Sequence, residues 1–377
     1  MFLVRELLAE IKSTFRDRDV IILLLGGPIF LTLLFGGVYL HNYLEDIPAA
    51  VLDEDNSSIS RMIIQQFDEN ERFDVRFHAG SKEELKNYID SRKAHMGIYI
   101  PHGFSKKISE MKSAEVLIFV DGTNMIIGNN SYAKAAEIVQ TVSAGIQMKI
   151  LQAKGLMPQT AEDMALVFNF NDRILYDPRM TYMNYLLLGF VAVFLQQVML
   201  SGVGFTLIKN SQSLANENSF IKVFKKIIIK ILACALFGLI STSAAIGIAG
   251  YVFKVPIRGS FLNVILLCVV FVFAISCPAI LLASILKERL KFSQVSFMLS
   301  LPAFVSCGYV WPQDQMPGLL TLLIKIFWPL IYFARPFAEL IFKGIPFEAV
   351  TTNLIQMIIY ILFWMPTSIL IFYKRTR

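Results

Sequence analysis

Five long stretches of this sequence contain no Asp, Glu, Lys or Arg, and they constrain the fold more than any other feature. They cover residues 20–40, 185–208, 231–253, 261–286 and 354–373. As a helix, each is long enough to cross a bilayer core of about 30 Å. The chain is 55% hydrophobic and 17% charged, whereas soluble domains are roughly 45–50% apolar and about 25% charged. The sequence therefore predicts a polytopic membrane protein.

A sixth span is predicted at residues 295–311, although this stretch is short for one. The apolar but proline-broken residues 319–342 that follow are interpreted as a re-entrant or interfacial segment. The first span is too long and starts too late for a signal peptide, and no small-residue cleavage site follows it. We expect it to remain in the mature protein. The prediction is therefore about six transmembrane helices.

Residues 1–19 are expected to form a cytoplasmic amphipathic helix before the first span. Leu3, Leu7, Ile11 and Phe15 recur at every fourth position, while the charged residues 5, 6 and 12 lie elsewhere on the helix. This pattern is typical of a helix that lies on a membrane surface.

Basic residues predict the orientation of the chain, because short cytoplasmic loops carry an excess of Lys and Arg. They gather in the N-terminal arm, in the loops after the second and fourth spans, and in the tail at residues 374–377; the set is Arg5, Lys12, Arg16, Arg18, Lys209, Lys222, Lys225, Lys226, Lys230, Lys287, Arg289, Lys291, Lys374, Arg375 and Arg377. We expect both termini in the cytoplasm, and residues 41–184 outside it. The net charge of +6 is then explained by anionic lipid, with no need for a nucleic-acid partner.

Residues 41–184, between the first two spans, alternate short apolar strands with amphipathic helices. Strands are predicted at residues 48–52, 73–77, 95–100 and 116–120, and helices at 57–69, 82–90, 105–112 and 130–154. Gly155 and Pro158 end the last helix, and residues 168–176 return the chain to the membrane. Such alternation favours an α/β layer. The predicted fold is thus a polytopic α-helical membrane protein with an inserted extracytoplasmic α/β domain, followed by a transmembrane domain at residues 185–373.

No pattern in the sequence predicts catalysis, a metal site or a bound cofactor. The acidic run at residues 53–56 lacks the spacing of a Ca²⁺ loop, and we interpret it as a turn whose Asp or Asn caps a helix starting near Ser57. The four cysteines, Cys234, Cys268, Cys277 and Cys307, all lie in predicted spans, so the outer domain has no disulfide. There is no G-x-x-x-x-G-K-[ST] loop. Any ATP and Mg²⁺ that drive this protein must bind to a partner.

Polar residues inside the spans are costly and therefore informative. They comprise Gln196, Gln197, Ser241, Thr242, Ser243 and Asn263. Hydrogen bonds between helices explain most such residues. The alternative is that some of them line a substrate path, for which the candidates are Gln196, Gln197, Ser241, Thr242 and Asn263.

Several segments together resemble the ABC-2 permease family, in the subgroup with a large extracytoplasmic domain between the first two spans. They are VLDEDNSSISR at 51–61, MGIYIPHGFS at 96–105, VDGTN at 120–124, YDP at 176–178, GYVWP at 308–312, MP at 316–317 and WPLIY at 328–332. The resemblance extends over essentially the whole chain.

The resemblance implies the membrane subunit of an ATP-driven exporter in the bacterial inner membrane. It implies a cytosolic ATPase subunit and a second permease copy as partners, with a periplasmic adaptor protein as a further one. The loop after the second span would couple to the ATPase through Lys209, Ser213, Leu214, Glu217 and Phe220. Many family members carry a charged stretch in this loop, and here it is mostly uncharged. The second copy can therefore be the same chain, in a homodimer, or a more typical permease, in a heterodimer. The cargo would be hydrophobic or amphipathic.

Two other functions are compatible with the residues. The first is a membrane-anchored scaffold or receptor of a secretion or envelope-assembly system, which would bind its partner through the outer domain. The second is an enzyme acting on lipid, although no cluster of acid, base and nucleophile appears at a predicted membrane boundary.

Overall fold

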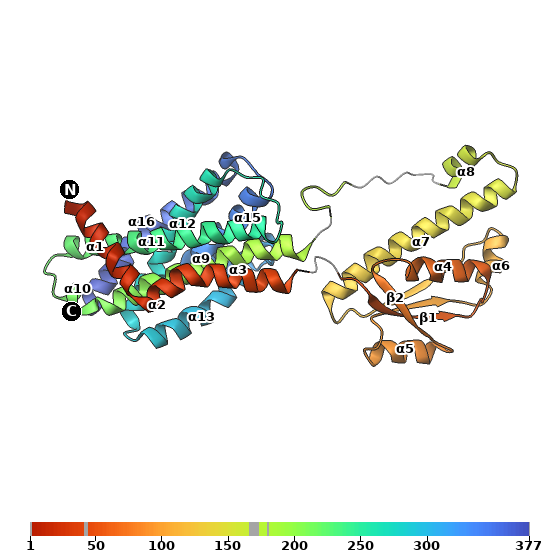
Figure 1. Ribbon diagram of the computed structural model, residues 1–377, viewed down its shortest axis with the longest axis horizontal. Coiled ribbons are helices and arrows are strands. Elements are labelled where there is room, and N and C mark those ends of the chain that lie inside the picture. Colours follow the sequence, from red (N-terminus) through yellow and green to blue (C-terminus); the bar gives the residue numbers. More distant parts are fainter. Residues whose placement is uncertain (1, 41–43, 166–172, 179–180, 377) are drawn as a thin grey trace. The chain divides into compact units, whose positions relative to one another are not determined.

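The computed structural model describes residues 2–40, 44–165, 173–178 and 181–376, and it divides into two compact units. The helical unit combines Met1–Asn42 with Ile174–Arg377, and the α/β domain is Tyr43–Arg173 between them (Figure 1). The predicted fold, a polytopic helical membrane protein with an inserted α/β domain, is confirmed.

The first part of the helical unit is an amphipathic helix followed by an interrupted span. Helix α1 (Phe2–Arg16) is the predicted one. The span that follows consists of α2 (Arg18–Ile21), a π-helical turn η1 (Ile22–Gly26) and α3 (Gly27–Val38). The wide turn lies just before Pro28, whose missing N–H removes a hydrogen bond from the helix.

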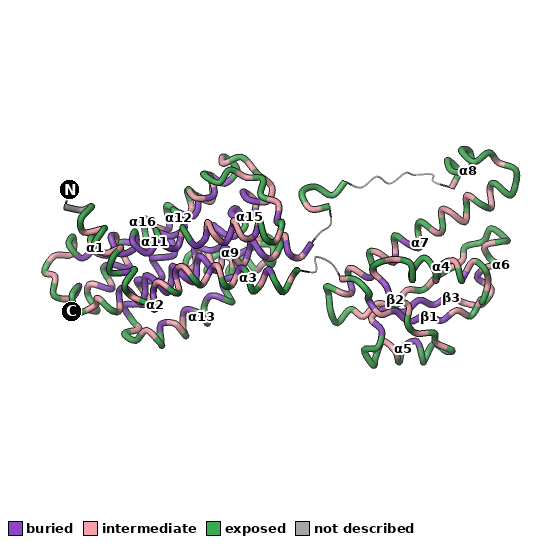
Figure 2. The backbone as a smooth tube through the Cα atoms, in the orientation of Figure 1, coloured by how far each residue is buried: buried purple, intermediate pink, exposed green. Residues whose placement is uncertain are grey.

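Among the described residues, four more helices are long and apolar enough to cross a membrane, and they match predicted spans. They are α9 (Tyr182–Lys209), α11 (Phe220–Tyr251), α12 (Phe261–Ile285) and α16 (Thr351–Thr376), the last preceded by the 3-10 turn η4 (Phe347–Val350). Helix α9 is apolar all round and almost wholly buried, because it packs against α3, α11 and α12 (Figure 2). It is the centre of the unit.

The predicted sixth span is not among the spans that the described residues offer. Its residues begin inside α13 (Arg289–Ser306), and this helix stops before the turn at Gly308, whose φ is +86°. A bent pair passes the length and hydropathy criteria instead: α14 (Gly318–Phe327) meets η3 (Pro329–Tyr332) and α15 (Ala334–Phe342) at 101°. The bend matches the proline break in the sequence; a re-entrant placement stays a prediction.

The α/β domain is a four-stranded sheet in the order β2-β1-β3-β4. Strands β1 (Ile47–Asp53), β2 (Phe73–His78) and β3 (Met96–Ile100) are parallel, and β4 (Leu117–Val120) is antiparallel to β3. The helices are α4 (Ser58–Asp68), α5 (Lys82–Asp90), α6 (Phe104–Ser109), α7 (Met125–Ala153) and α8 (Pro158–Ala165). The pleat sends alternate side chains of β1 to two cores, with Ala49 and Val51 beneath α4 and α7, and Ala50 and Leu52 against α5.

One predicted helix cap and one predicted helix start were wrong, and each error has a local cause. Helix α4 is capped by Ser57, which forms a capping box with Ser60, while Asp53 supports that box by accepting the Ser60 hydroxyl at 2.6 Å. Helix α7 begins five residues early, because the Asn124 side chain accepts the N–H groups of Ile126 and Ile127. The predicted end of this helix is confirmed, because α7 ends at Ala153 and Gly155 follows with a φ of +89°. Most of the predicted return segment, residues 168–172, lies outside the described residues.

Candidate coupling face and intramembrane polar cluster

The helical unit brings most of the basic loops to one end, where both chain termini also lie (Figure 1). Helix α1, the end of α9, the short helix α10 (Ser211–Ala215), the start of α11, the start of α13 and the end of α16 meet there. We call this region the basic end. Side-chain pairs between elements hold it together.

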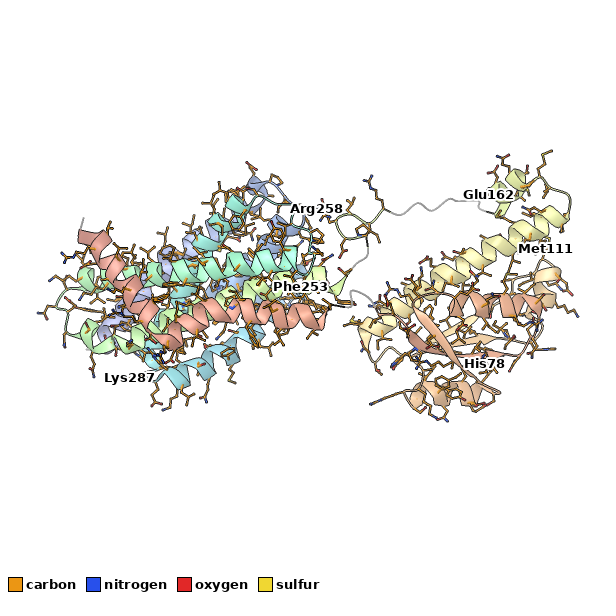
Figure 3. The ribbon with its side chains drawn as sticks, in the orientation of Figure 1. His78, Met111, Glu162, Phe253, Arg258 and Lys287 are labelled. Carbon is orange, nitrogen blue, oxygen red and sulfur yellow. The ribbon has the colours of Figure 1, made fainter. Side chains whose placement is uncertain are left out.

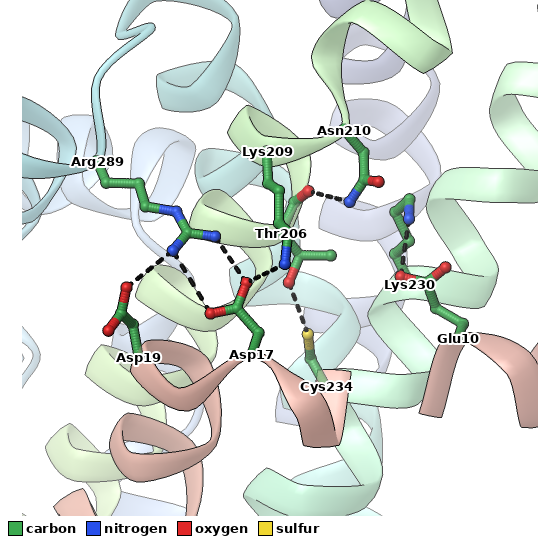
Figure 4. Close-up of polar contacts among 9 residues, drawn as sticks. All are labelled: Glu10, Asp17, Asp19, Thr206, Lys209, Asn210, Lys230, Cys234 and Arg289. Atoms are coloured by element: carbon green, nitrogen blue, oxygen red, sulfur yellow. Dashed lines mark hydrogen bonds and ion pairs between the residues drawn. The ribbon is translucent and has the colours of Figure 1, made fainter. Parts of the chain in front are cut away.

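Asp17 is the centre of the basic end (Figure 4). Its carboxylate accepts hydrogen bonds from Lys209 Nζ at 2.7 Å and from Arg289 Nη2 at 2.8 Å. Arg289 also binds Asp19 at 3.0 Å. Asp17 therefore connects the start of the first span to the end of α9 and to the loop after α12.

The surroundings of Asp17 keep it charged. Burial alone raises the pKa of this carboxyl, but the hydrogen bonds from Arg289 and Lys209 outweigh burial and lower the pKa from 3.8 to about 2. Because its pKa is lowered in the folded state, Asp17 stabilises that state at pH values above its ordinary pKa of 3.8. This stabilisation is lost as the pH falls from there towards 2. The Asp17 contacts are thus fully formed at every physiological pH.

A second ion pair fastens α1 to α11. Lys230 Nζ lies 2.7 Å from Glu10 Oε1, and the two side chains are only 8% and 18% exposed (Figure 4). The sequence placed Lys230 among the basic residues near a span end, whereas the structure buries it with a partner. Leaving either charge of such a pair alone costs about 3–5 kcal/mol.

The predicted coupling loop is a folded structure. Leu214 is 2% exposed and belongs to the helical core. Glu217 pairs with Lys226, whose hydrogen bond lowers the pKa of Glu217. Phe220 lies edge-on to Tyr373 of α16, with ring centroids 5.8 Å apart. Lys209, another predicted coupling residue, is bound to Asp17. Ser213 is exposed, and with the exposed Gln212 and Asn216 it forms the outer surface of the loop.

Within the membrane-spanning part, the two predicted glutamines join α9 to α13 and to Trp328, which lies between α14 and η3. Gln197 Nε2 donates to Ser201 at 3.1 Å and to Ser296 at 3.2 Å, and its oxygen accepts from Ser300. Gln196 accepts from Trp328 Nε1 at 2.8 Å. We call these residues, all buried except the half-buried Trp328, the glutamine cluster. Its hydrogen-bonding groups are engaged with one another, as in a helix-to-helix contact.

The other predicted path residues lie apart from the glutamine cluster. The hydroxyls of Ser241 and Thr242 both donate to the carbonyl of Gly238, at 3.0 and 2.8 Å, within their own helix α11. Asn263 lies in the first turn of α12 and is half-buried. The structure therefore brings together Gln196 and Gln197, and it does not join them to Ser241, Thr242 or Asn263.

Comparison with known proteins identifies the family. The model of the ABC-2 family transporter proteins matches residues 18–370. This chain belongs to the ABC-2 transporter family. It is 23% identical over 278 residues to a protein described as a probable multidrug ABC transporter permease, YbhR, of Escherichia coli strain K12, and equally to its counterpart in Escherichia coli O157:H7. The match covers 71% of this chain and 70% of each relative.

In this ABC-2 permease, some family-like segments meet at the end of the helical unit opposite the basic end. Tyr309 stacks on Tyr185, with centroids 5.2 Å apart, and the Tyr185 hydroxyl donates to the Tyr309 carbonyl at 2.6 Å. Arg258 donates to the carbonyls of Tyr176 and Phe342 at 2.9 and 2.8 Å. A cavity of about 730 Å³ lies beside the tyrosines and is lined partly by α15.

Sequence reasoning missed the partners that build both sites. Arg289 was counted only as a loop charge and Asp17 was not singled out, although their position at span ends was a usable signal. Ser296 and Ser300 are spaced by four, so they share one helix face. That spacing, opposite two adjacent glutamines, was the signal for the glutamine cluster. Among the residues described, no three His, Cys, Asp or Glu side chains converge on a metal position.

Proposed function

We propose that this chain is the membrane subunit of an ATP-driven exporter in the bacterial cytoplasmic membrane. Two permease copies, alike or different, would pair with cytosolic ATPases and move a hydrophobic or amphipathic cargo outward. The basic end would face the cytoplasm with both termini, and the α/β domain would lie outside. The observation that carries the proposal is the Asp17 contact set, since it joins three elements next to the coupling loop.

The mechanism follows from how the coupling loop is attached. ATP is hydrolysed in the partner, so only a mechanical contact can transmit the energy. Ser213 and its exposed neighbours on α10 offer that contact. Leu214 anchors α10 in the core. Lys209, the last residue of α9, is bound to Asp17. Displacing α10 would therefore pull on α9 and on the first span together, as a two-state switch requires.

The test changes the outer surface of the loop and spares its anchor. Ser213→Arg with Asn216→Arg places bulk where the ATPase would dock, and Leu214 stays in the core. We expect the ATPase to be lost from pull-downs and ATP-dependent transport of cargo into inverted vesicles to stop, with unchanged thermal unfolding. Glu348→Arg is the matched control, because Glu348 is exposed before α16, at the end of that helix opposite Tyr373. Export that continues in the double variant would refute this docking site.

The scaffold alternative makes a different prediction in the same pull-down. A scaffold would be recovered from native membranes without an ATPase, and the loop substitutions would change nothing. Recovery of an ATPase with the unaltered chain therefore separates the two functions.

A further inference from the structure

The α/β domain contains an apolar cavity that its own sheet cannot fill. Helix α7 has 29 residues and is about 43 Å long, whereas the strands have four to seven residues and span about 13–23 Å. The buried residues of α7 end at Ile138, so the C-terminal half of the helix is not covered by the core of the domain. Its apolar face continues there as Val142, Ile146 and Ile150, each four residues apart and only half-buried.

A cavity of about 620 Å³ lies along this face, between α7, α6 and α8. Its volume falls within the range of about 300–1,000 Å³ that is typical of small-molecule sites. Four lining residues are polar, namely Lys112, Ser113, Ser143 and Gln147, and the other twelve are apolar. Such a surface binds an apolar chain by burial, and the few polar groups orient it.

The mouth of the cavity adds flexible and cationic groups. Met111 and Met164 line it and are more than half exposed, and Figure 3 shows Met111 beside the C-terminal end of α7. Methionine adapts to ligands of different shape. Of the described residues that line the cavity, Lys112 alone is charged. A second ammonium, that of Lys154, contacts the Met111 sulfur. Lys112 pairs with Glu110 in an exposed, weak contact that a ligand can replace.

We infer that this cavity binds an anionic amphiphile, whose acyl chain lies along Val142, Ile146 and Ile150 and whose head group meets Lys112 and Lys154. The occupant is a single-chain carboxylate or a molecule of the same chemistry. Its identity as the cargo rests on the proposed export function, whereas its binding does not, since binding needs neither ATP nor a partner.

The domain offers a direct way to test this. All four cysteines lie in the helical unit and are buried, so Ser143→Cys introduces one accessible thiol in the cavity. Ser91→Cys, at the exposed end of α5, is the matched control. The full chain in lipid nanodiscs is labelled with a maleimide, with and without dodecanoate. We expect dodecanoate to slow labelling of Ser143→Cys by about tenfold, the effect of a ligand at ten times its Kd, and to leave Ser91→Cys unchanged.

Two further variants define the chemistry. Ile146→Trp fills the cavity and should remove the protection of Ser143→Cys. Lys112→Glu with Lys154→Glu changes only exposed side chains, and it should make dodecylammonium the better protector in place of dodecanoate. Equal labelling of both thiols with and without dodecanoate would overturn the inference, as would equal protection by both amphiphiles in the unaltered cavity. Because no ATPase is present, loss of protection is distinguishable from failure of the export proposal.

Discussion

The two ends of the helical unit are held together by different kinds of contact. At the basic end, charged side chains bind one another, as Asp17 binds Arg289 and Glu10 binds Lys230. At the opposite end, side chains bind backbone carbonyls, as Arg258 does with Tyr176 and Phe342. A side-chain pair can exchange partners when elements move, whereas a backbone carbonyl moves only with its whole segment. The comparison indicates a switchable basic end and a fixed opposite end.

The largest effect on stability should come from breaking the buried pair. Lys230→Ala leaves the carboxyl group of Glu10, which is 18% exposed, without its ion-pair partner, so we expect the free energy of unfolding to fall by about 3–5 kcal/mol. Unfolding by denaturant in nanodiscs measures it. Glu10→Leu combined with Lys230→Met is the matched control and should stay within about 1 kcal/mol of the unaltered chain. Equal losses in both variants would show that packing, and not charge, holds α1.

Asp17→Asn should affect transport more than stability. The amide keeps the shape of the side chain but removes the charge that holds Lys209 and Arg289. We expect ATP-dependent export to fall by about tenfold, within the range of about 5–150-fold that coupling energies produce. Initial export rates per folded molecule measure it. Unchanged export would place the switch elsewhere.

Arg258→Ala tests the fixed end. Its two hydrogen bonds are made by an exposed side chain, so we expect a loss of about 1 kcal/mol in the free energy of unfolding. Export per folded molecule should not change. A tenfold loss of export here, equal to that of Asp17→Asn, would remove the distinction between the two ends.

Gln197→Leu should be milder still, because hydrogen bonds between transmembrane helices average about 0.6 kcal/mol. Thermal unfolding should shift slightly, and the KM for cargo should stay the same, since Gln197 is engaged with three serines. A change in KM or in cargo preference would instead place the glutamine cluster on the substrate path.

The last effect is confined to acidic pH. Because the pKa of Asp17 is held at about 2, its contribution to stability should be constant above pH 4 and should disappear as the pH falls from about 4 to 2. Unfolding measured across this range should show a step that Asp17→Asn lacks. A step between pH 5 and 7 would contradict the Asp17 geometry.

The spans and strands were predictable because their signals are local. A charge-free stretch or an apolar strand needs no knowledge of its neighbours, and both kinds were found at nearly the right residues. The contacts of Asp17, by contrast, are with residues that lie 192 and 272 positions further along the chain. Lys230 was misjudged for the same reason, since only the fold reveals that Glu10 lies beside it. The predicted sixth span has no counterpart among the described helices that are long and apolar enough to cross a membrane, because α13 ends at Ser306, before the turn at Gly308.

The π-helical turn Ile22–Gly26 has a mechanical consequence for the first span. Such a turn holds one residue more than an α-helical turn. Converting it to α-helix would rotate everything before it by about 100° and shift it by about 1.5 Å. Asp17 lies just ahead of that turn. A change in this turn can therefore rotate the N-terminal end of the first span, which carries Asp17, relative to α3. The depth of the span in the membrane would stay almost constant.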